Sequence, residues 1–207
     1  MKSIKYFAMF LLTGLFSLSM ASCLYDDDDD SQKKISPAYY TQISGSYMGS
    51  VQYYVDDLTT PKKVEGIATV ITADSTIKVT GLPAEAFVKN ISNDDIRNAL
   101  LAQPTPELTS RFLIYNAYDE GLDFMTYPLT VEFKNVMVGE SSHDYQIRLL
   151  YPSLTSGYAN AKCSVVGFYM YPAALYEGDT MIEQFVTNTG EVGKEDIMYI
   201  EGIRSIK

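Results

Sequence analysis

Residues 45–55, with the sequence GSYMGSVQYYV, decide the fold class of this chain. Tyr47, Val51 and Tyr53 stand at every second or fourth position, and smaller or more polar residues lie between them. Successive side chains of a strand point to opposite faces of a sheet, so this period of two predicts a half-buried strand over 46–55. Gly49 indicates a bend or the close approach of another backbone.

The same strand pattern recurs through the rest of the chain. Two β-branched runs, 64–72 and 75–80, are joined at Ala73-Asp74 and predict a hairpin. The apolar parity changes near Asn135, which predicts a β-bulge. Further strands are predicted at 112–118, 124–127, 129–138, 144–151, 162–171, 180–186 and 197–206, with turns between them, including one at 153–160.

One clear helix interrupts the strands. Ser92 is its predicted N-cap, Asp95 follows three residues later, and Pro104 ends it. A shorter helical segment is expected at 84–89. In an open sheet, about eight short antiparallel strands with one interrupting helix would leave edge strands with unpaired backbone N–H and C=O groups. We therefore expect a mostly β (α+β) domain that closes into a barrel-like form or folds into a sandwich, and we favour the barrel.

The first 22 residues read as a cleavable signal peptide. Lys2 and Lys5 precede an apolar core at 6–16, and small residues follow at 17–22. A transmembrane helix needs about 20 apolar residues, which this core does not supply. An uncleaved anchor is the alternative interpretation.

Cys23 follows two small residues, and this arrangement resembles the lipobox of bacterial lipoproteins. The resemblance implies that Cys23 becomes the first residue of the mature chain and carries acyl chains such as palmitate, which together give a lasting membrane anchor. The aspartates Asp26, Asp27, Asp28, Asp29 and Asp30 then repel one another into an extended tether. This acidic run resembles the export signal of Bacteroides-type surface lipoproteins. We expect a lipid-anchored protein in the outer membrane facing the cell exterior, with the periplasmic face as the alternative.

These features divide the chain into a signal peptide at 1–22, a lipidated tether and linker at 23–43, and one mostly β domain at 44–207. The full chain carries a net charge of −10, and removal of the leader takes away two lysines and no acid. No cluster of Lys and Arg is present, so nucleic acid is excluded as a partner. Cys163 is the second of only two cysteines. It is expected to be a buried structural thiol with no internal disulfide partner.

Residues 45–51 also resemble the opening strand of lipocalin-like (calycin-type) domains, with Tyr47 where that family usually has Trp. The resemblance implies a barrel and a ligand in its mouth. The expected partners of such a module are a glycan, an apolar ligand or a protein.

Catalytic patterns are weak. His143 is the only histidine, no Gly-x-Ser-x-Gly elbow occurs, and one His with one free Cys does not complete a usual zinc site. Turn acids such as Asp123 and Glu177 leave a carboxylate hydrolase as an alternative. We expect no enzyme activity, no cofactor and no metal.

Tyrosine is the compositional feature that points to recognition, because the chain has 17 tyrosines and no tryptophan. Tyr169 and Tyr171 are expected to be packed. The tyrosines near turns or strand ends are the candidates for ligand binding: Tyr115, Tyr118, Tyr127, Tyr151, Tyr158 and Tyr176.

Two tripeptides, at 74–76 and 179–181, resemble the O-glycosylation pattern of Bacteroides-type exported proteins. They make Ser75 and Thr180 candidate glycosylation sites. The function expected from the sequence is a non-catalytic binding module or an accessory subunit of an uptake system. A protein-interaction or inhibitor domain is the alternative.

Overall fold

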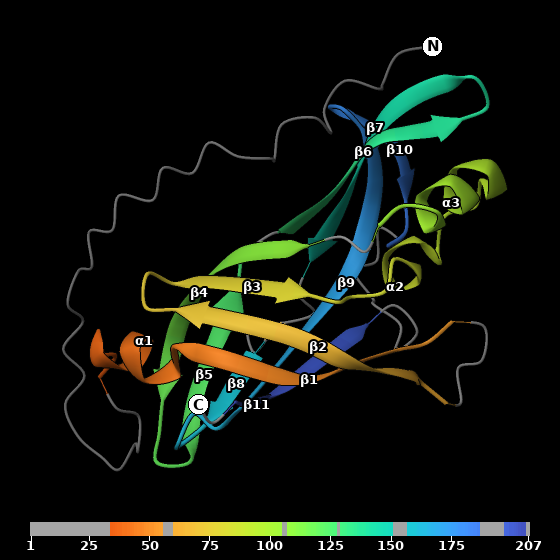
Figure 1. Ribbon diagram of the computed structural model, residues 1–207. Coiled ribbons are helices and arrows are strands. Elements are labelled where there is room, and N and C mark those ends of the chain that lie inside the picture. The colour runs from red at the N-terminus through yellow and green to blue at the C-terminus, as the bar shows by residue number, and fades with distance from the viewer. Residues whose placement is uncertain are drawn as a thin grey trace. The chain divides into compact units, whose positions relative to one another are not determined.

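The computed structural model describes residues 34–55, 60–104, 107–127, 129–150, 157–186 and 197–205. These stretches hold short helices and many strands (Figure 1). None of their helices is long and apolar enough to cross a membrane. The helices are α1 (Ala38–Ile43), α2 (Glu85–Val88) and α3 (Asp94–Leu101). The strands are β1 (Gly45–Tyr53), β2 (Lys62–Thr72), β3 (Thr76–Thr80), β4 (Leu108–Ala117), β5 (Gly121–Thr126), β6 (Leu129–Val138), β7 (Ser141–Leu150), β8 (Gly157–Asn160), β9 (Val165–Glu177), β10 (Thr180–Gln184) and β11 (Met198–Arg204).

Eight of the strands close into an antiparallel barrel. They run in the order β11-β1-β2-β3-β4-β5-β8-β9, and pairing of β9 with β11 completes the ring. The expected mostly β fold class is therefore confirmed, and the closed ring selects the barrel over the sandwich. Closure removes the exposed edges that an open sheet would present.

Strand β9 belongs to two sheets. Its first half pairs with β8 and β11 in the barrel, whereas its second half pairs with β7 and β10. Strand β6 pairs with β7, so a second sheet of order β10-β9-β7-β6 grows out of the barrel (Figure 1). The strand predicted at 162–171 thus continues to Glu177. Helices α2 and α3 lie against this second sheet, α2 contacting β9 and α3 contacting β6.

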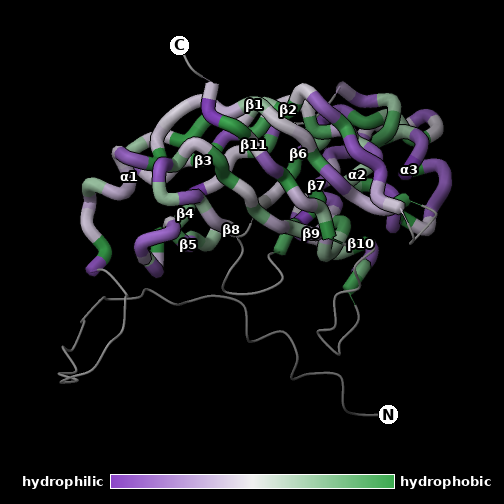
Figure 2. The backbone as a smooth tube through the Cα atoms, turned by 90° about the horizontal axis from the view of Figure 1, so that it is seen from below, coloured by the Kyte–Doolittle hydropathy of each residue, from purple (hydrophilic) through white to green (hydrophobic). Residues whose placement is uncertain are grey.

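The alternation in β1 places side chains as the sequence predicts. Tyr47, Val51 and Tyr53 are buried, whereas Met48 is exposed. Hydrophobic and hydrophilic residues alternate along much of the backbone (Figure 2). At Gly49 a Cβ atom would lie 1.8 Å from the carbonyl oxygen of Glu201 on β11, which confirms the predicted close approach.

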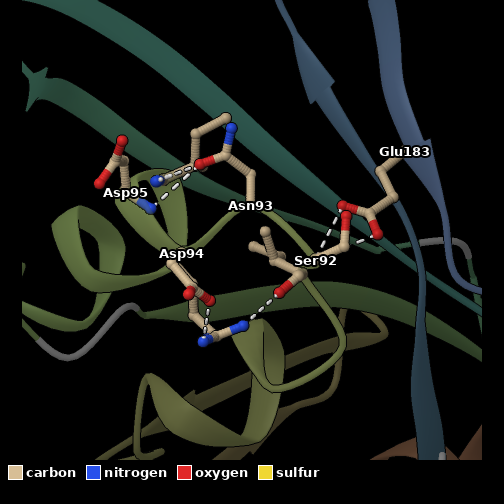
Figure 3. A network of polar contacts seen from close by, with 8 residues as sticks. Ser92, Asn93, Asp94, Asp95 and Glu183 are labelled. Atoms are coloured by element: carbon tan, nitrogen blue, oxygen red, sulfur yellow. Dashed lines mark hydrogen bonds and ion pairs between the residues drawn. The ribbon is translucent and has the colours of Figure 1, made fainter.

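The predicted cap of α3 is wrong by one residue. Asn93 is the N-cap, and its side-chain oxygen accepts from the backbone N–H groups of Asp95 (3.0 Å) and Ile96 (3.1 Å). The backbone N–H of Ser92 instead donates to the Glu183 carboxylate on β10 at 3.1 Å (Figure 3). Asn and Ser are equally good caps, so residue type alone does not distinguish the two positions.

Two further predictions have opposite outcomes. The bulge near Asn135 is confirmed by a register shift between Phe133 and Val136 and by a positive φ of 55° at Asn135. The turn predicted at 153–160 is wrong in its last residues, which form β8. Gly157 and Ala159 are buried there against β5 and β9, and a Cβ at Gly157 would lie 2.4 Å from the Phe124 ring. The small residues of this segment predict a turn in the sequence. In the structure, Gly157 instead allows the Phe124 ring to pack close to the backbone of β8.

Candidate functional site

Aromatic rings fill the interior of the barrel. Phe112 and Phe124 lie 5.6 Å apart between ring centroids, and Phe124 and Phe168 lie 6.3 Å apart. Tyr47 and Tyr53 are fully buried from the β1 side. Among the described residues these rings belong to the buried core of the barrel. The described residues offer a surface for recognition on the outer wall.

A shallow open groove of about 230 Å³ lies on that outer wall. Gln52, Tyr199 and Tyr169 are neighbours across β1, β11 and β9, because Gln52 pairs with Tyr199 and Tyr199 pairs with Tyr169. The period of two explains their outward direction, since Met198 and Ile200 on either side of Tyr199 are buried. The lining residues are Gln52, Tyr54, Pro61, Tyr169, Ile197 and Tyr199.

Two tyrosine rings form the aromatic part of the groove. The ring centroids of Tyr169 and Tyr199 are 4.7 Å apart, and the ring planes are inclined by 31°. Tyr169 is 38% exposed, so the expectation that it is packed is wrong, whereas Tyr171 is buried as expected. The cause is parity: in β9, Val166, Phe168 and Met170 point inward, and Tyr169 points outward.

A carboxylate holds the Tyr199 hydroxyl. Tyr199 Oη donates to Glu201 Oε2 at 2.8 Å, and the hydroxyls of Tyr158 and Tyr199 are 3.0 Å apart. Tyr158 Oη also donates to Glu201 Oε2, at 3.4 Å. Burial, followed by the hydrogen bonds with Tyr158 and Glu201, raises the pKa of Tyr199 well above its ordinary value.

Gly167 makes room for this network. A Cβ at this position would lie 2.6 Å from Tyr158 Cε1 and 2.7 Å from Tyr199 Oη. Gly167 pairs with Tyr158 on β8 and with Glu201 on β11, so it stands between the two strands that carry the network. Any larger residue would push the two hydroxyls apart.

A second tyrosine and carboxylate contact lies on the next strands. Tyr118 Oη donates to Asp123 Oδ1 at 2.9 Å, and Asn116 Nδ2 donates to Asp123 Oδ2 at 3.2 Å. Burial, with the Asp123 hydrogen bond second, raises the pKa of Tyr118 to about 12. Asp123 pairs with Tyr158 across β5 and β8, so this cluster adjoins the first.

The tyrosines that the sequence proposed for ligand binding do not meet at one mouth. Tyr118 and Tyr158 lie near each other on either side of Asp123, as described above. Tyr115 is partly buried in β4, and Tyr127 is 47% exposed just beyond the end of β5. Tyr176 lies in the second half of β9. The Cζ atom of Arg148 lies over the Tyr176 ring, 3.6 Å from the ring centroid. Tyr151 lies outside the described residues.

Sequence reasoning missed Gln52, Tyr169 and Tyr199 as site residues. The sequence carries part of the information, since Tyr199 and Glu201 alternate with the apolar residues of β11 and are therefore expected on the outer face of that strand. Nothing local indicates that residues 52, 169 and 199 become neighbours.

The remaining polar candidates are placed as follows. His143 Nδ1 lies 2.6 Å from Glu177 Oε1, and its ring stacks on Tyr145 with centroids 5.7 Å apart. His143 therefore lies in β7 with an acidic neighbour. Within the described stretches, no three or more His, Cys, Asp or Glu side chains gather as metal ligands would. Cys163 is buried and free, and burial raises the pKa of its thiol.

The modification candidates also have definite positions. Ser75 lies in the turn between β2 and β3 and is partly buried, and Thr180 is exposed at the start of β10. Their glycosylation stays a prediction. The signal peptide, Cys23 and the aspartates Asp26–Asp30 lie outside the described residues.

Comparison with known proteins gives one match. A family model described as "Domain of unknown function (DUF4840)" matches residues 42–177, from the end of α1 to the end of β9. Strand β11, which closes the barrel and carries Tyr199 and Glu201, follows the matched segment. No curated protein and no solved structure matches the chain.

Proposed function

The chain belongs to the family of the domain of unknown function DUF4840, and on that premise we propose that it is a lipid-anchored surface lipoprotein acting as a non-catalytic binding module. Its ligand binds to the outer wall of the barrel. The protein acts either as a binding protein by itself or as an accessory subunit of an uptake system. The observation that carries this proposal is the filled barrel interior, which directs recognition to the exposed tyrosine groove.

The chemistry of the groove supports binding in preference to catalysis. Its lining has aromatic and aliphatic side chains and one amide, and the nearby Glu201 carboxylate is engaged by two tyrosine hydroxyls. Asp123 is likewise held by Tyr118 and Asn116. Between Glu201 on β11 and Asp123 on β5 lie β9 and β8. At about 4.8 Å per strand this places the two acids roughly 14 Å apart along the sheet, beyond the spacing of a glycosidase pair.

The anchor is supported by the order of features around Cys23: a cationic start, a short apolar run, two small residues and the cysteine. The acidic residues Asp26–Asp30 support export to the outer face. Cys23→Ser is expected to move the protein from the membrane fraction to the soluble fraction. Cys163→Ser, which removes the other thiol, is the matched control and is expected to stay in the membrane fraction.

Persistence of Cys23→Ser in the membrane fraction would refute the lipid anchor. Orientation is measured by protease treatment of intact cells, where digestion is expected. Full protection in intact cells, with digestion after lysis, would contradict the surface location.

An exposed apolar strip favours protein interaction as a second candidate function. Met48 is 49% exposed and Ile203 is 61% exposed, and the two are directly opposite each other in β1 and β11. Crosslinking on intact cells is expected to capture a partner with the native protein and less of it with Ile203→Ser. Equal capture with both proteins would refute a role for this strip.

A further inference from the structure

We propose that the outer-wall groove binds the apolar face of a neutral sugar ring, with Tyr169 as the stacking surface and Glu201 as a positioning residue that holds Tyr199. This inference rests on the proposed binding function and assigns the ligand class.

The groove is small and open. Its volume is about 230 Å³. Sites that enclose a whole drug-sized ligand are commonly about 300–1,000 Å³ and deeper. An open groove of this size suits a ligand that lies on the wall with one face, while the rest of a longer chain stays in solvent.

The aromatic geometry supplies the stacking face. A sugar ring has a C–H face that is apolar and a rim of hydroxyls, and a tyrosine ring offers a flat apolar surface of similar width. Tyr169 is 38% exposed, and its ring centroid lies 4.7 Å from that of Tyr199 on the neighbouring strand. Because Glu201 binds the Tyr199 hydroxyl at 2.8 Å, the Tyr199 ring is held in this position.

The polar groups of the groove fit hydroxyls. Gln52 stands opposite Tyr199 on β1, and its amide has both donors and an acceptor, as a sugar hydroxyl has both roles. Every lining residue in the described part of the chain is uncharged. The Glu201 carboxylate, which binds the Tyr199 hydroxyl, is also bound by the hydroxyl of Tyr158. A neutral ligand therefore fits this site better than a cation.

The test uses the mature chain and four soluble probes: methyl glucoside, methyl galactoside, methyl mannoside and N-acetylglucosamine. Each is titrated from about 1 to 100 mM, the range in which one weakly held ring binds. The protein has no tryptophan, so its intrinsic fluorescence reports tyrosine directly. At least one probe is expected to change the fluorescence and the ring NMR signals of Tyr169 in a saturable way.

Tyr169→Ala is expected to weaken binding at least tenfold. Tyr127→Ala is the matched control, because Tyr127 is 47% exposed and is not among the lining residues of the groove. Glu201→Gln is expected to weaken binding severalfold and to lower the pKa of Tyr199, which a role in stability alone would not require. Thermal unfolding of each variant checks that the fold is kept.

Three results would overturn the inference: no saturable binding of any sugar, binding that survives Tyr169→Ala, or binding that Tyr127→Ala abolishes equally. Tetramethylammonium is the cationic probe. If it binds with dependence on Tyr169 while no sugar binds, the sugar class is wrong and the binding module stands. If neither kind of probe binds, the sugar class is refuted, and the cell-surface and crosslinking experiments decide the proposed function separately.

Discussion

Contact between a tyrosine hydroxyl and a carboxylate is the recurring residue-level feature of this protein. Tyr53 donates to Glu85 at 2.9 Å, and Tyr118 and Tyr199 donate to Asp123 and Glu201. An ionised carboxylate only accepts, so it keeps the proton on its tyrosine partner. Burial and the carboxylate together raise the pKa of each of these tyrosines, with burial as the larger cause.

This relation predicts the effect of Glu201→Gln on Tyr199. The neutral amide removes the negative charge that disfavours tyrosinate, so the pKa of Tyr199 is expected to fall toward its ordinary value. Burial remains, so the fall is partial. Spectrophotometric titration of the tyrosines measures it.

Glu65→Gln is the matched control, because Glu65 is an exposed acid on the neighbouring β2 that pairs with Lys63 at 2.7 Å. It is expected to leave the Tyr199 pKa unchanged. An unchanged Tyr199 pKa in Glu201→Gln would contradict the assigned hydrogen bond.

At the scale of elements, the cap of α3 gives a sharp comparison. Asn93→Ala removes the side-chain acceptor for two backbone N–H groups and is expected to lower the free energy of unfolding by about 1 kcal/mol. Ser92→Ala keeps the backbone N–H that binds Glu183 and is expected to change it by less than about 0.5 kcal/mol. Urea unfolding of both variants measures the difference. A larger loss in Ser92→Ala than in Asn93→Ala would restore Ser92 as the cap.

The closing pair of the barrel gives the second comparison at this scale. Gly49→Ala places a Cβ 1.8 Å from a backbone oxygen of β11, and the backbone has little freedom to yield. It is expected to destabilise the fold by about 3 kcal/mol or more.

Gly66→Ala is the control, because its φ of 84° disfavours alanine but nothing lies within 4 Å of the added carbon. It is expected to cost about 1–2 kcal/mol. Equal losses in the two variants, measured by urea unfolding, would contradict a close approach of β1 and β11.

Elements that depend on local pattern were predictable, and those that depend on distant partners were not. Strand β1, the bulge at Asn135 and the short α2 follow from periodicity and turn chemistry close in sequence. Strand β8 was missed because its small residues resemble a turn and become a strand only between β5 and β9. The α3 cap was misplaced by one residue because Ser92 and Asn93 are equally good caps by residue type.

At the scale of the whole molecule, the tyrosines make stability sensitive to alkali. The folded state raises the pKa of Tyr47, Tyr53, Tyr118, Tyr145 and Tyr199. A group with a raised folded pKa contributes stability that is fully present below its unfolded pKa, about 10 for tyrosine, and is lost as the pH rises through the folded value. Unfolding midpoints in urea are therefore expected to hold up to about pH 9 and to fall steeply above about pH 10. Midpoints that stay level through about pH 11 would contradict the raised values.

The candidate site was only partly predictable at this scale. The sequence predicts tyrosine as the recognising residue, and of its candidates Tyr118 and Tyr158 lie beside Asp123, where their part in binding stays a prediction. The outward position of Tyr169 was not predicted, because parity within β9 is set by which face meets the barrel interior. Gln52 is more than a hundred residues from Tyr169 and Tyr199 in the chain, and it meets them only through closure of the ring.

By itself the sequence determined the mostly β class, the alternation of each main strand and the expectation of a lipidated, exported chain, since side-chain period and leader chemistry are local properties. Tertiary structure decided that the ring closes between β9 and β11, that aromatic side chains fill its interior and that the tyrosine groove lies outside. The physical reason is that pairing between strands depends on packing among residues far apart in the chain, which no local period encodes.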